Sequence, residues 1–144
     1  MRHSSSSSRL SGLVGFHLRR VSAQSQIELE DVLADLDLRT IHYAVMAAIE
    51  VSPGGRQREI AGEARIRPGN LVPLLDQLEK RGLVRRAVDE ADRRSVRFSL
   101  TDAGQAMLDD IHQRVLRHEQ RFFAALDEVE QAGLIAVLRR IETP

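Results

Sequence analysis

Three consecutive polar residues, Asp92, Arg93 and Arg94, have the clearest capacity for chemistry in this chain. They lie between two short runs rich in β-forming residues, 83–88 and 95–100, so the arginines are predicted at the tip of a hairpin. A guanidinium at such a tip fits the negative potential of a narrow DNA minor groove, and Asp92 could hold the Arg94 guanidinium by accepting its hydrogen bonds. The tip therefore indicates DNA binding. Without the hairpin, the same pair would be a surface ion pair worth about 0–1 kcal/mol.

The segment before the hairpin supplies a second candidate surface. Leucines recur there with helical spacing, after a proline suited to a first helical position. The leucines are Leu71, Leu74, Leu75 and Leu78. The other face carries the residues that could enter a major groove: Pro68, Gly69, Asn70, Val72, Pro73 and Gln77. Asn70 is the best single reader, because its amide can pair bidentately with adenine, although an Asn near a helix end can instead bond its own backbone. Val72 and Pro73 offer only apolar contact, and Pro73 removes a backbone hydrogen bond to Gly69.

Six further arginines bracket these two segments and are candidates for phosphate contacts, which supply affinity and position without sequence information. They are Arg56, Arg58, Arg65, Arg67, Arg85 and Arg86. From Arg56 to Arg97 the chain has eleven Lys or Arg against seven Asp or Glu, a local charge of +4, whereas the remainder carries −4. Each arginine alone could be an ordinary solvated residue. Together they put the positive charge where DNA would bind.

These candidate residues require a helix-turn-helix followed by a β-ribbon. Apolar spacing predicts helices over residues 9–30, 37–50, 57–64 and 68–82, strands over 83–88 and 95–100, and helices over 101–126 and 127–141. Residues 52–55 are predicted to form a turn. Asp37, Thr101, and Asp127 with Glu130, are expected to cap the helices that follow them. The expected fold is mostly α-helical with a small β-ribbon wing, a winged helix-turn-helix.

This order of elements and several motifs resemble the MarR family of winged-helix transcriptional regulators. The resemblance spans about residues 9–142 and rests on LRTIHYAVMAAIE, QREIAGEA, RPGNLVPLLDQLEKRGLVRR and DEADRRSVRFSLTDAG. The most specific part is the family's Asp-x-Arg followed by Leu-Thr-x-x-Gly, matched by Asp92, Arg94, Leu100, Thr101 and Gly104. Two positions depart from the family. Arg39 replaces a capping Thr or Ser, so that Asp37 is expected to cap instead, and Pro73 replaces a polar or basic reader.

The resemblance implies a symmetric homodimer with intertwined terminal helices, and a repressor that a small ligand releases from a palindromic operator. It also implies an effector pocket between the terminal helices and the DNA-binding lobe, in the region of His17, Arg20, His42 and Tyr43. The chain would divide into a disordered tail at 1–8, an N-terminal dimerisation helix at 9–37, a winged helix-turn-helix lobe at 38–100 and C-terminal dimerisation helices at 101–144.

The terminal segments carry more apolar surface than a small lobe can cover. The residues concerned are Leu13, Leu18, Val21, Phe122, Phe123, Leu126, Leu134, Leu138 and Ile141. Packing between two chains would bury them, as in obligate interfaces. The alternative is a helical cap that the terminal segments form on a monomer.

Composition argues against several other kinds of protein. Without cysteine the chain has no disulfide, thiolate metal site or thiol redox sensor. No apolar run is long enough for a membrane span, and residues 1–10 lack the apolar stretch of a secretory signal, so we expect a cytoplasmic protein. No catalytic or cofactor motif occurs, so we expect neither an enzyme nor a bound cofactor. Two alternatives stay open: a winged-helix adaptor without a DNA role, and a metal-responsive regulator in which His42 and His112 share a metal.

Overall fold

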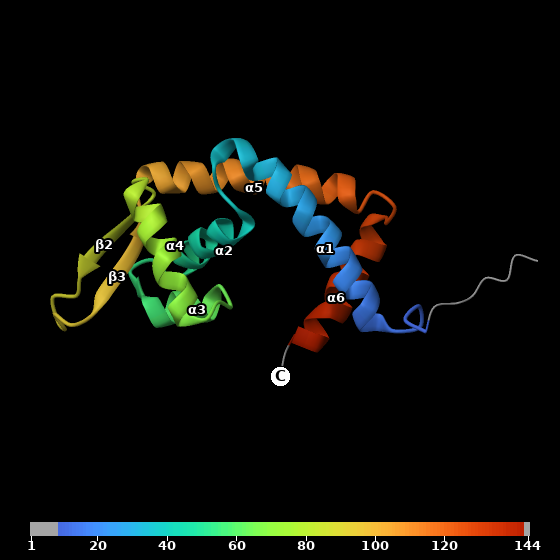
Figure 1. Ribbon diagram of the computed structural model, residues 1–144, viewed down its shortest axis with the longest axis horizontal. Coiled ribbons are helices and arrows are strands. Elements are labelled where there is room, and N and C mark those ends of the chain that lie inside the picture. The colour runs from blue at the N-terminus through green and yellow to red at the C-terminus, as the bar shows by residue number, and fades with distance from the viewer. Residues whose placement is uncertain (1–8, 143–144) are drawn as a thin grey trace, which may run out of the picture.

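The structure, a computed structural model, describes residues 9–142 (Figure 1). The tail predicted at 1–8 lies outside the described residues. The elements are α1 (Val14–Leu33), a 3-10 turn η1 (Ala34–Leu36), α2 (Thr40–Val51), β1 (Gly55–Arg56), α3 (Gln57–Glu63), α4 (Pro68–Lys80), β2 (Val84–Val88), β3 (Val96–Leu100), α5 (Asp102–Phe122) and α6 (Glu128–Glu142). This mostly helical chain with one small antiparallel sheet confirms the predicted fold class.

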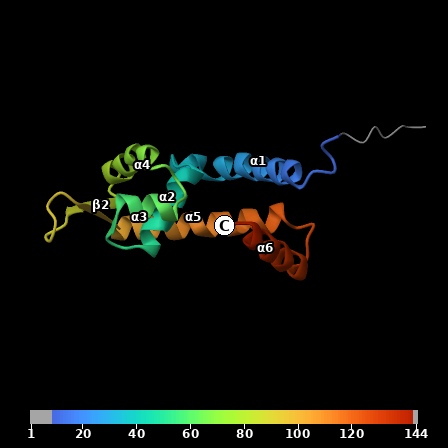
Figure 2. The same cartoon turned by 90° about the horizontal axis from the view of Figure 1, so that it is seen from below.

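Helix α5 is the long element that joins the two ends of the molecule. At one end α2, α3, α4 and the β2–β3 ribbon lie around its first half, and at the other α1 and α6 lie near its second half (Figure 1). Turned by 90°, the molecule shows α1 and α4 at one level, above α5 and α6 (Figure 2). The lobe that carries the helix-turn-helix is therefore connected to the terminal helices mainly through α5 and α1.

The hydrophobic core lies where the lobe meets the end of α1 and the first half of α5. Its fully buried members come from the last turn of α1, from α2, α3 and α4, and from α5; they include Leu33, Met46, Ile49, Ile60, Leu71, Leu75, Leu78 and Ile111. The inward face of the predicted helix at 68–82 is thus the leucine face. Helix α6 contributes no buried residue. Among residues 9–142, no helix is long and apolar enough to cross a membrane.

The end of α4 follows from its glycine. Gly82 has a φ of +69°, a conformation that costs a residue with a Cβ. In this conformation the Gly82 N–H donates to the Glu79 carbonyl at 2.9 Å and the Leu83 N–H to the Leu78 carbonyl at 3.0 Å. Two carbonyls of the last turn are thereby satisfied, as in a Schellman motif, and the chain turns into β2.

Two of the three predicted caps are present. The Thr101 hydroxyl accepts the Gly104 N–H at 3.0 Å and so caps α5. Before α6, Asp127 accepts the Glu130 N–H at 2.8 Å while Glu130 accepts the Asp127 N–H at 2.9 Å, a reciprocal capping box. Both caps join residues three apart, which is why local sequence could predict them.

The third predicted cap, Asp37 on α2, is wrong. Asp37 takes a left-handed conformation with a φ of 52° and ends η1, donating its N–H to the Ala34 carbonyl. Helix α2 begins only at Thr40, whose N–H donates to the Glu30 carboxylate of α1 at 3.3 Å. Glu30, ten residues away in the sequence, therefore accepts an N–H at the start of α2, as Asp37 was expected to do.

The turn predicted at 52–55 also contains part of a strand. β1 pairs antiparallel with β3, through Gly55 opposite Phe98 and Arg56 opposite Arg97, so the sheet has the order β1-β3-β2. Two residues are too few to show the alternation by which a strand is recognised in sequence.

Gly104 marks the closest approach of α5 to the lobe. A Cβ built at this position would lie 1.9 Å from the Leu83 carbonyl oxygen, which is backbone and cannot rotate away. We therefore expect Gly104→Ala to lower the free energy of unfolding by about 1–3 kcal/mol, the usual cost of overpacking.

Thermal and urea unfolding of the purified variant measures this change. Gly62→Ala is the matched control, because a Cβ at Gly62 in α3 meets nothing within 4 Å. The control should be neutral or gain up to about 1 kcal/mol, since alanine is the better helix former. Equal stability of the two variants would contradict the close contact.

Candidate nucleic-acid interface

The paired strands β2 and β3 support the basic tip. Their register runs from Val84 opposite Leu100 to Val88 opposite Val96, and the tip follows as residues 89–95. Arg93 and Arg94 are exposed there. The Asp92 carboxylate accepts the Arg94 backbone N–H at 3.1 Å, and the Asp92 carbonyl accepts the Ser95 N–H at 2.8 Å. These bonds hold the turn in shape.

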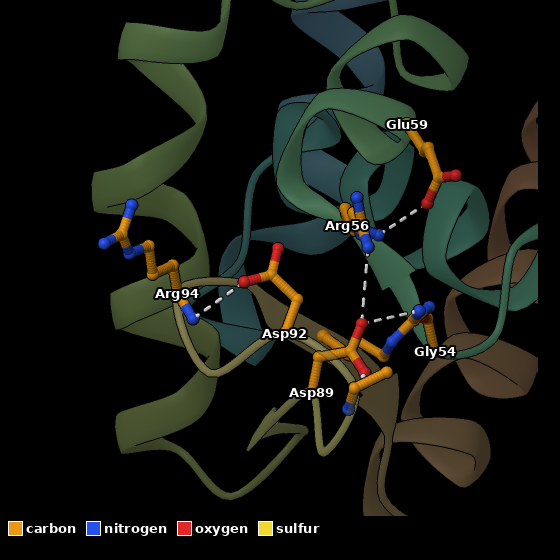
Figure 3. A network of polar contacts seen from close by, with 8 residues as sticks. Gly54, Arg56, Glu59, Asp89, Asp92 and Arg94 are labelled. Carbon is orange, nitrogen blue, oxygen red and sulfur yellow. Dashed lines mark hydrogen bonds and ion pairs between the residues drawn. The ribbon is translucent and has the colours of Figure 1, made fainter.

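The expectation that Asp92 holds the Arg94 guanidinium is wrong. Figure 3 shows the Arg94 side chain extending away from the Asp92 carboxylate, to which only its backbone is bonded. Arg94 therefore presents its guanidinium without a carboxylate partner among the described residues. That leaves its charge available to an external anion.

Asp89, at the base of the tip, was not identified from the sequence. It is buried, with 7% of its surface exposed, and its carboxylate accepts from Arg97 Nη2 at 2.8 Å and Arg56 Nη2 at 3.4 Å. It also accepts the Ala91 N–H at 3.1 Å, while Arg97 Nη1 donates to the Gly54 carbonyl at 2.9 Å (Figure 3). Hydrogen bonding from Arg97, then from the Ala91 backbone and Arg56, lowers the pKa of Asp89 below its usual value. The ionised carboxylate thus ties β1, β3 and the tip together.

Arg56 and Arg86, both candidates for phosphate contacts, have acidic partners within the protein. Arg56 reaches Asp89, and its backbone N–H donates to Glu59 of α3 at 2.6 Å. Arg86 bonds Asp76 at 2.6 Å and Glu79 at 3.2 Å, and its guanidinium lies over the Phe98 ring. The Arg56 side chain thus joins β1 to the base of the tip, its backbone joins β1 to α3, and the Arg86 side chain joins β2 to α4.

Three other arginines line an open hollow at the turn between α3 and α4. Arg58, Arg65 and Arg67 are exposed and surround, with Pro68, a cavity of about 420 Å³. Arg65 has a φ of 53°, so the turn holds it in a left-handed conformation. Arg85 is exposed on β2. The structure leaves these four arginines without ion pairs among the described residues.

The first turns of α4 are exposed as predicted from the leucine spacing. Pro68, Gly69, Asn70, Val72 and Pro73 all face solvent. Helix α4 continues through Pro73, which lacks the N–H that the Gly69 carbonyl would otherwise accept. This half of the helix carries no acidic residue. It therefore offers a mixed polar and apolar surface without negative charge.

Gln77, in the second half of α4, has a partner within the protein. Its Oε1 lies 2.8 Å from Nε2 of His42 on α2. The sequence placed Gln77 with the base readers, but the structure commits its amide to an intramolecular hydrogen bond. We therefore exclude Gln77 from the readers proposed below. No local sequence pattern could reveal a contact between residues 35 apart.

The four residues suggested for an effector pocket do not come together within one subunit. His42 lines a cavity between α1, α2 and α4, whereas His17 lines an apolar cavity of about 480 Å³ with residues of α1 and α6 and with Phe123, which follows α5. Tyr43 hydrogen bonds His112 of α5 at 2.8 Å, and burial raises the pKa of its phenol. Arg20 lies over the Phe16 ring.

The histidines do not form the metal site considered from sequence. His42 and His112 have different partners, Gln77 and Tyr43. Within residues 9–142, no three side chains of the kinds that ligate metals gather at one point.

A buried histidine was also missed. His118 on α5 is 1% exposed, stacks on Phe122 and points Nε2 toward Glu28 of α1 at 3.5 Å. His118 follows Ile111 and Val115 at helical spacing, and this spacing is the sequence pattern that indicates its place on the inward face of α5. Nearby, Arg114 bonds Asp35 at 2.7 Å and lowers the pKa of that carboxyl, so α5 is also joined by charge to the η1 turn that follows α1.

Known proteins share this arrangement. A model of the MarR family matches residues 41–96, from α2 to the first residue of β3. The transcriptional regulator PecS of Dickeya dadantii is 32% identical over 137 residues, which cover 94% of this chain and 76% of PecS. The chain belongs to the MarR family.

Solved structures extend the MarR-family match to nearly the whole chain. CouR, a transcriptional repressor solved with a 23-mer DNA duplex, is 33% identical with a TM-score of 0.87, over 93% of this chain and 95% of CouR. CouR from Rhodococcus jostii RHA1, solved with p-coumaroyl-CoA, gives 32% identity and a TM-score of 0.82, over 96% of this chain and 97% of CouR. This protein is thus a MarR-family transcriptional regulator, and the predicted family is confirmed.

We predict that Asp89→Asn loosens the wing of this MarR-family protein while leaving its core folded. The neutral amide cannot hold two guanidinium groups, so DNA affinity should fall by roughly an order of magnitude and amides 89–97 should exchange faster. Glu90→Gln, an exposed change in the same loop, is the control and should have little effect.

The charge of Asp89 also predicts a pH dependence. Because folding lowers its pKa, its contribution to stability is present above the ordinary value of about 3.9 and is lost as pH falls through the folded value. NMR titration of the Asp89 carboxyl should give a midpoint below that ordinary value. A midpoint above it would contradict the network.

Proposed function

We propose that this protein is a homodimeric, DNA-binding transcriptional repressor that a small effector releases from a palindromic operator. The observation that carries the proposal is its likeness to CouR, a repressor solved on a DNA duplex, which extends over nearly the whole chain. The exposed first turns of α4 and the unpaired arginines of the wing support it independently.

The DNA contacts that we propose fall into three groups. The first turns of α4 enter the major groove, where Asn70 reads a base and Val72 and Pro73 make apolar contacts; Pro68 and Gly69 let the backbone approach closely. Arg94, with Arg93, reaches an adjacent minor groove. Arg58, Arg65, Arg67 and Arg85 contact phosphates. Asp92 and Arg56 act by shaping the wing, through the backbone of Arg94 and through Asp89.

The dimer is proposed from exposed apolar surface on the terminal helices. Apolar side chains of α6, of α1 and of the residue just before α1 are 39–69% exposed; they include Leu13, Val14, Leu18, Val21, Leu134, Ile135, Val137 and Ile141. Contiguous patches of this kind are rare on monomers, and α6 buries no residue within its own chain. We assign residues 9–37 and 101–144 to dimerisation and 38–100 to DNA binding. Two lobes on one duplex imply half-sites about one turn apart, roughly 10 bp.

The MarR family consists of transcriptional regulators, and we propose regulation as the sole activity of this chain. Acting on DNA, it would work in the cytoplasm. CouR was solved with a small molecule as well as with DNA, which supports an effector for this chain too. An effector acts by binding the two conformers of the dimer unequally, so that the spacing of the two α4 helices no longer fits the operator.

Arg94→Ala is expected to weaken operator binding by about tenfold or more, equivalent to about 1.4 kcal/mol, with the fold and the dimer unchanged. Its guanidinium supports no core contact, so the loss would come from DNA alone. Titration of the operator at several salt concentrations should show a slope reduced by about one. Arg94→Lys should restore only part of the affinity, because an ammonium lacks the planar fork.

Arg117→Ala, an exposed arginine of α5 away from the wing, is the control and should bind the operator normally. Normal affinity of Arg94→Ala would remove the wing from DNA binding. Failure of the wild-type protein to prefer any site in its own upstream region over random DNA would contradict the proposed function itself.

Leu138→Glu with Ile141→Glu should abolish the soluble dimer. Leu138 lines the apolar cavity between α1 and α6, and Ile141 is 65% exposed on the last turn of α6. If the terminal helices pair between subunits, two carboxylates there should give insoluble or unfolded protein. Sedimentation and circular dichroism measure this outcome. A soluble, folded monomer would show that the lobe is stable alone and that the dimer is not obligate.

A further inference from the structure

Helix α4, the recognition helix of the helix-turn-helix, is held to the rest of the lobe by apolar and by polar contacts. Its four leucines are buried against the core. In its first turn, the Gln57 side chain of α3 donates to the Pro68 carbonyl at 3.2 Å. In later turns, Arg86 of β2 bonds Asp76 and Glu79. Apolar burial is not directional, so the direction of α4 depends on its polar contacts.

Arg81, the residue that follows α4, makes a polar contact that leaves the lobe. Its Nη1 donates to the Asp37 carbonyl at 2.7 Å and its Nη2 to the Leu36 carbonyl at 2.9 Å. Among residues 9–142 its guanidinium has no carboxylate partner, so both contacts are to backbone.

The two carbonyls belong to the end of the η1 turn, which directly follows α1. The partners of Gln77, of Pro68 and of the acids on α4 all lie within residues 38–100. Only the Arg81 contact joins this end of the recognition helix to residues 9–37, the segment assigned above to dimerisation. Figure 2 shows α1 and α4 at one level, on the same side of α5.

The Arg81 contact is the second of two that hold the end of α4. The first is on α5, where the Thr101 N–H donates to the Leu83 carbonyl at 3.1 Å beside Gly104. A contact at one point leaves rotation about that point. The Arg81 guanidinium, two residues before Leu83, holds the same end of α4 to η1 and opposes this rotation.

A small rotation at this end has a large effect at the other end of the helix. From Arg81 back to Asn70 the distance along the helix axis is about 16 Å, at a rise of about 1.5 Å per residue. A rotation of about 10° would therefore move Asn70 by about 3 Å, close to the rise of about 3.4 Å for one base pair of DNA.

We propose that Arg81 is a positioning residue for operator recognition: by holding the end of α4 to η1, it sets the half-site spacing that the dimer accepts. Arg81 itself contacts no base or phosphate. Because α1 pairs between subunits, a tie from α4 to η1 places each recognition helix relative to the dimer axis. Without the tie, the two α4 helices fit a wider range of spacings. This inference rests on the proposed function, since half-site spacing has meaning only for a dimer on an operator.

The separation of the two recognition helices can be measured without DNA. The chain has no cysteine, so Val72→Cys, at a site on α4 that is 40% exposed, takes one spin label per subunit. In this background, pulsed electron paramagnetic resonance on the full-length dimer should give a narrow distance distribution with Arg81 and a wider one with Arg81→Met. Methionine keeps the unbranched stem but has no donor. Arg81 is exposed, so its replacement leaves the core intact.

Two variants are matched controls for Arg81→Met. Lys80→Met removes the neighbouring charge, whose exposed side chain has no polar partner among the described residues. Gln77→Leu breaks a contact of α4 that stays within the lobe. Both should keep the narrow distribution of distances.

The second measurement is made on DNA. Operators are selected from random-sequence DNA with the wild-type protein, then remade with one base pair inserted or deleted between the half-sites. Each base pair turns one half-site by about 35° and shifts it by about 3.4 Å. Wild-type affinity should therefore fall by about tenfold or more, whereas in Arg81→Met the fall should be about threefold or less. The ratio is taken within each variant, so a changed basal affinity does not affect it, and both controls should keep the wild-type ratio.

Arg81→Lys distinguishes a positioning contact from a phosphate contact. An ammonium keeps the charge but lacks the planar fork that reaches two carbonyls, so this variant should restore little of the spacing preference. The salt dependence of operator binding should be the same in wild type and in Arg81→Met, because no phosphate contact is lost.

The outcomes separate this inference from the proposed function. An unchanged spacing ratio in Arg81→Met, with or without a wider distance distribution, would overturn the inference. Full recovery by Arg81→Lys, with a salt slope lowered by about one in Arg81→Met, would indicate a phosphate contact and overturn it as well. A wider distribution in a protein for which no operator can be selected would support Arg81 as the tie of α4 and contradict the proposed function alone.

Discussion

The backbone of Leu83 lies so close to Gly104 that no side chain fits between them. This contact seats the first turn of α5 against the junction of α4 and β2, and the Thr101 N–H donates to the Leu83 carbonyl at 3.1 Å at the same point. From there α5 passes through the core of the lobe and on to α1. Because α5 is one uninterrupted helix, the orientation of the DNA-binding lobe relative to the terminal helices depends on this junction.

Electrostatic partners divide the arginines of this protein into two kinds. Arg97, Arg86 and Arg114 pair with acids of other elements and act as structural ties. The exposed arginines of the wing tip and of the turn before α4 have no such partners among the described residues. A guanidinium stays charged at any physiological pH, so an arginine without an internal acid keeps its charge for an external anion. In this way a chain of zero net charge can present a basic surface.

Polar contacts between different elements couple the recognition helix α4 and helix α5 to the rest of the protein. The His42–Gln77 bond joins α2 to the recognition helix, and the ion pair of Arg114 with Asp35 joins α5 to the η1 turn after α1. Both contacts lie near the boundary of the lobe with the terminal helices. A ligand or a partner subunit that alters this boundary therefore acts on elements that the fold has already coupled to α4.

The sequence alone determined the features that depend on neighbours three or four residues apart. The leucine face of α4, the Thr101 cap, the capping box before α6 and the glycine end of α4 were all predictable, because helical geometry brings such residues together. So was the hairpin with its exposed arginines. Only the tertiary structure decided which acid caps α2, that Asp89 gathers Arg56 and Arg97, and that Gln77 binds His42. These contacts join residues far apart in the chain, and their partners are selected by the packing of elements rather than by any local spacing.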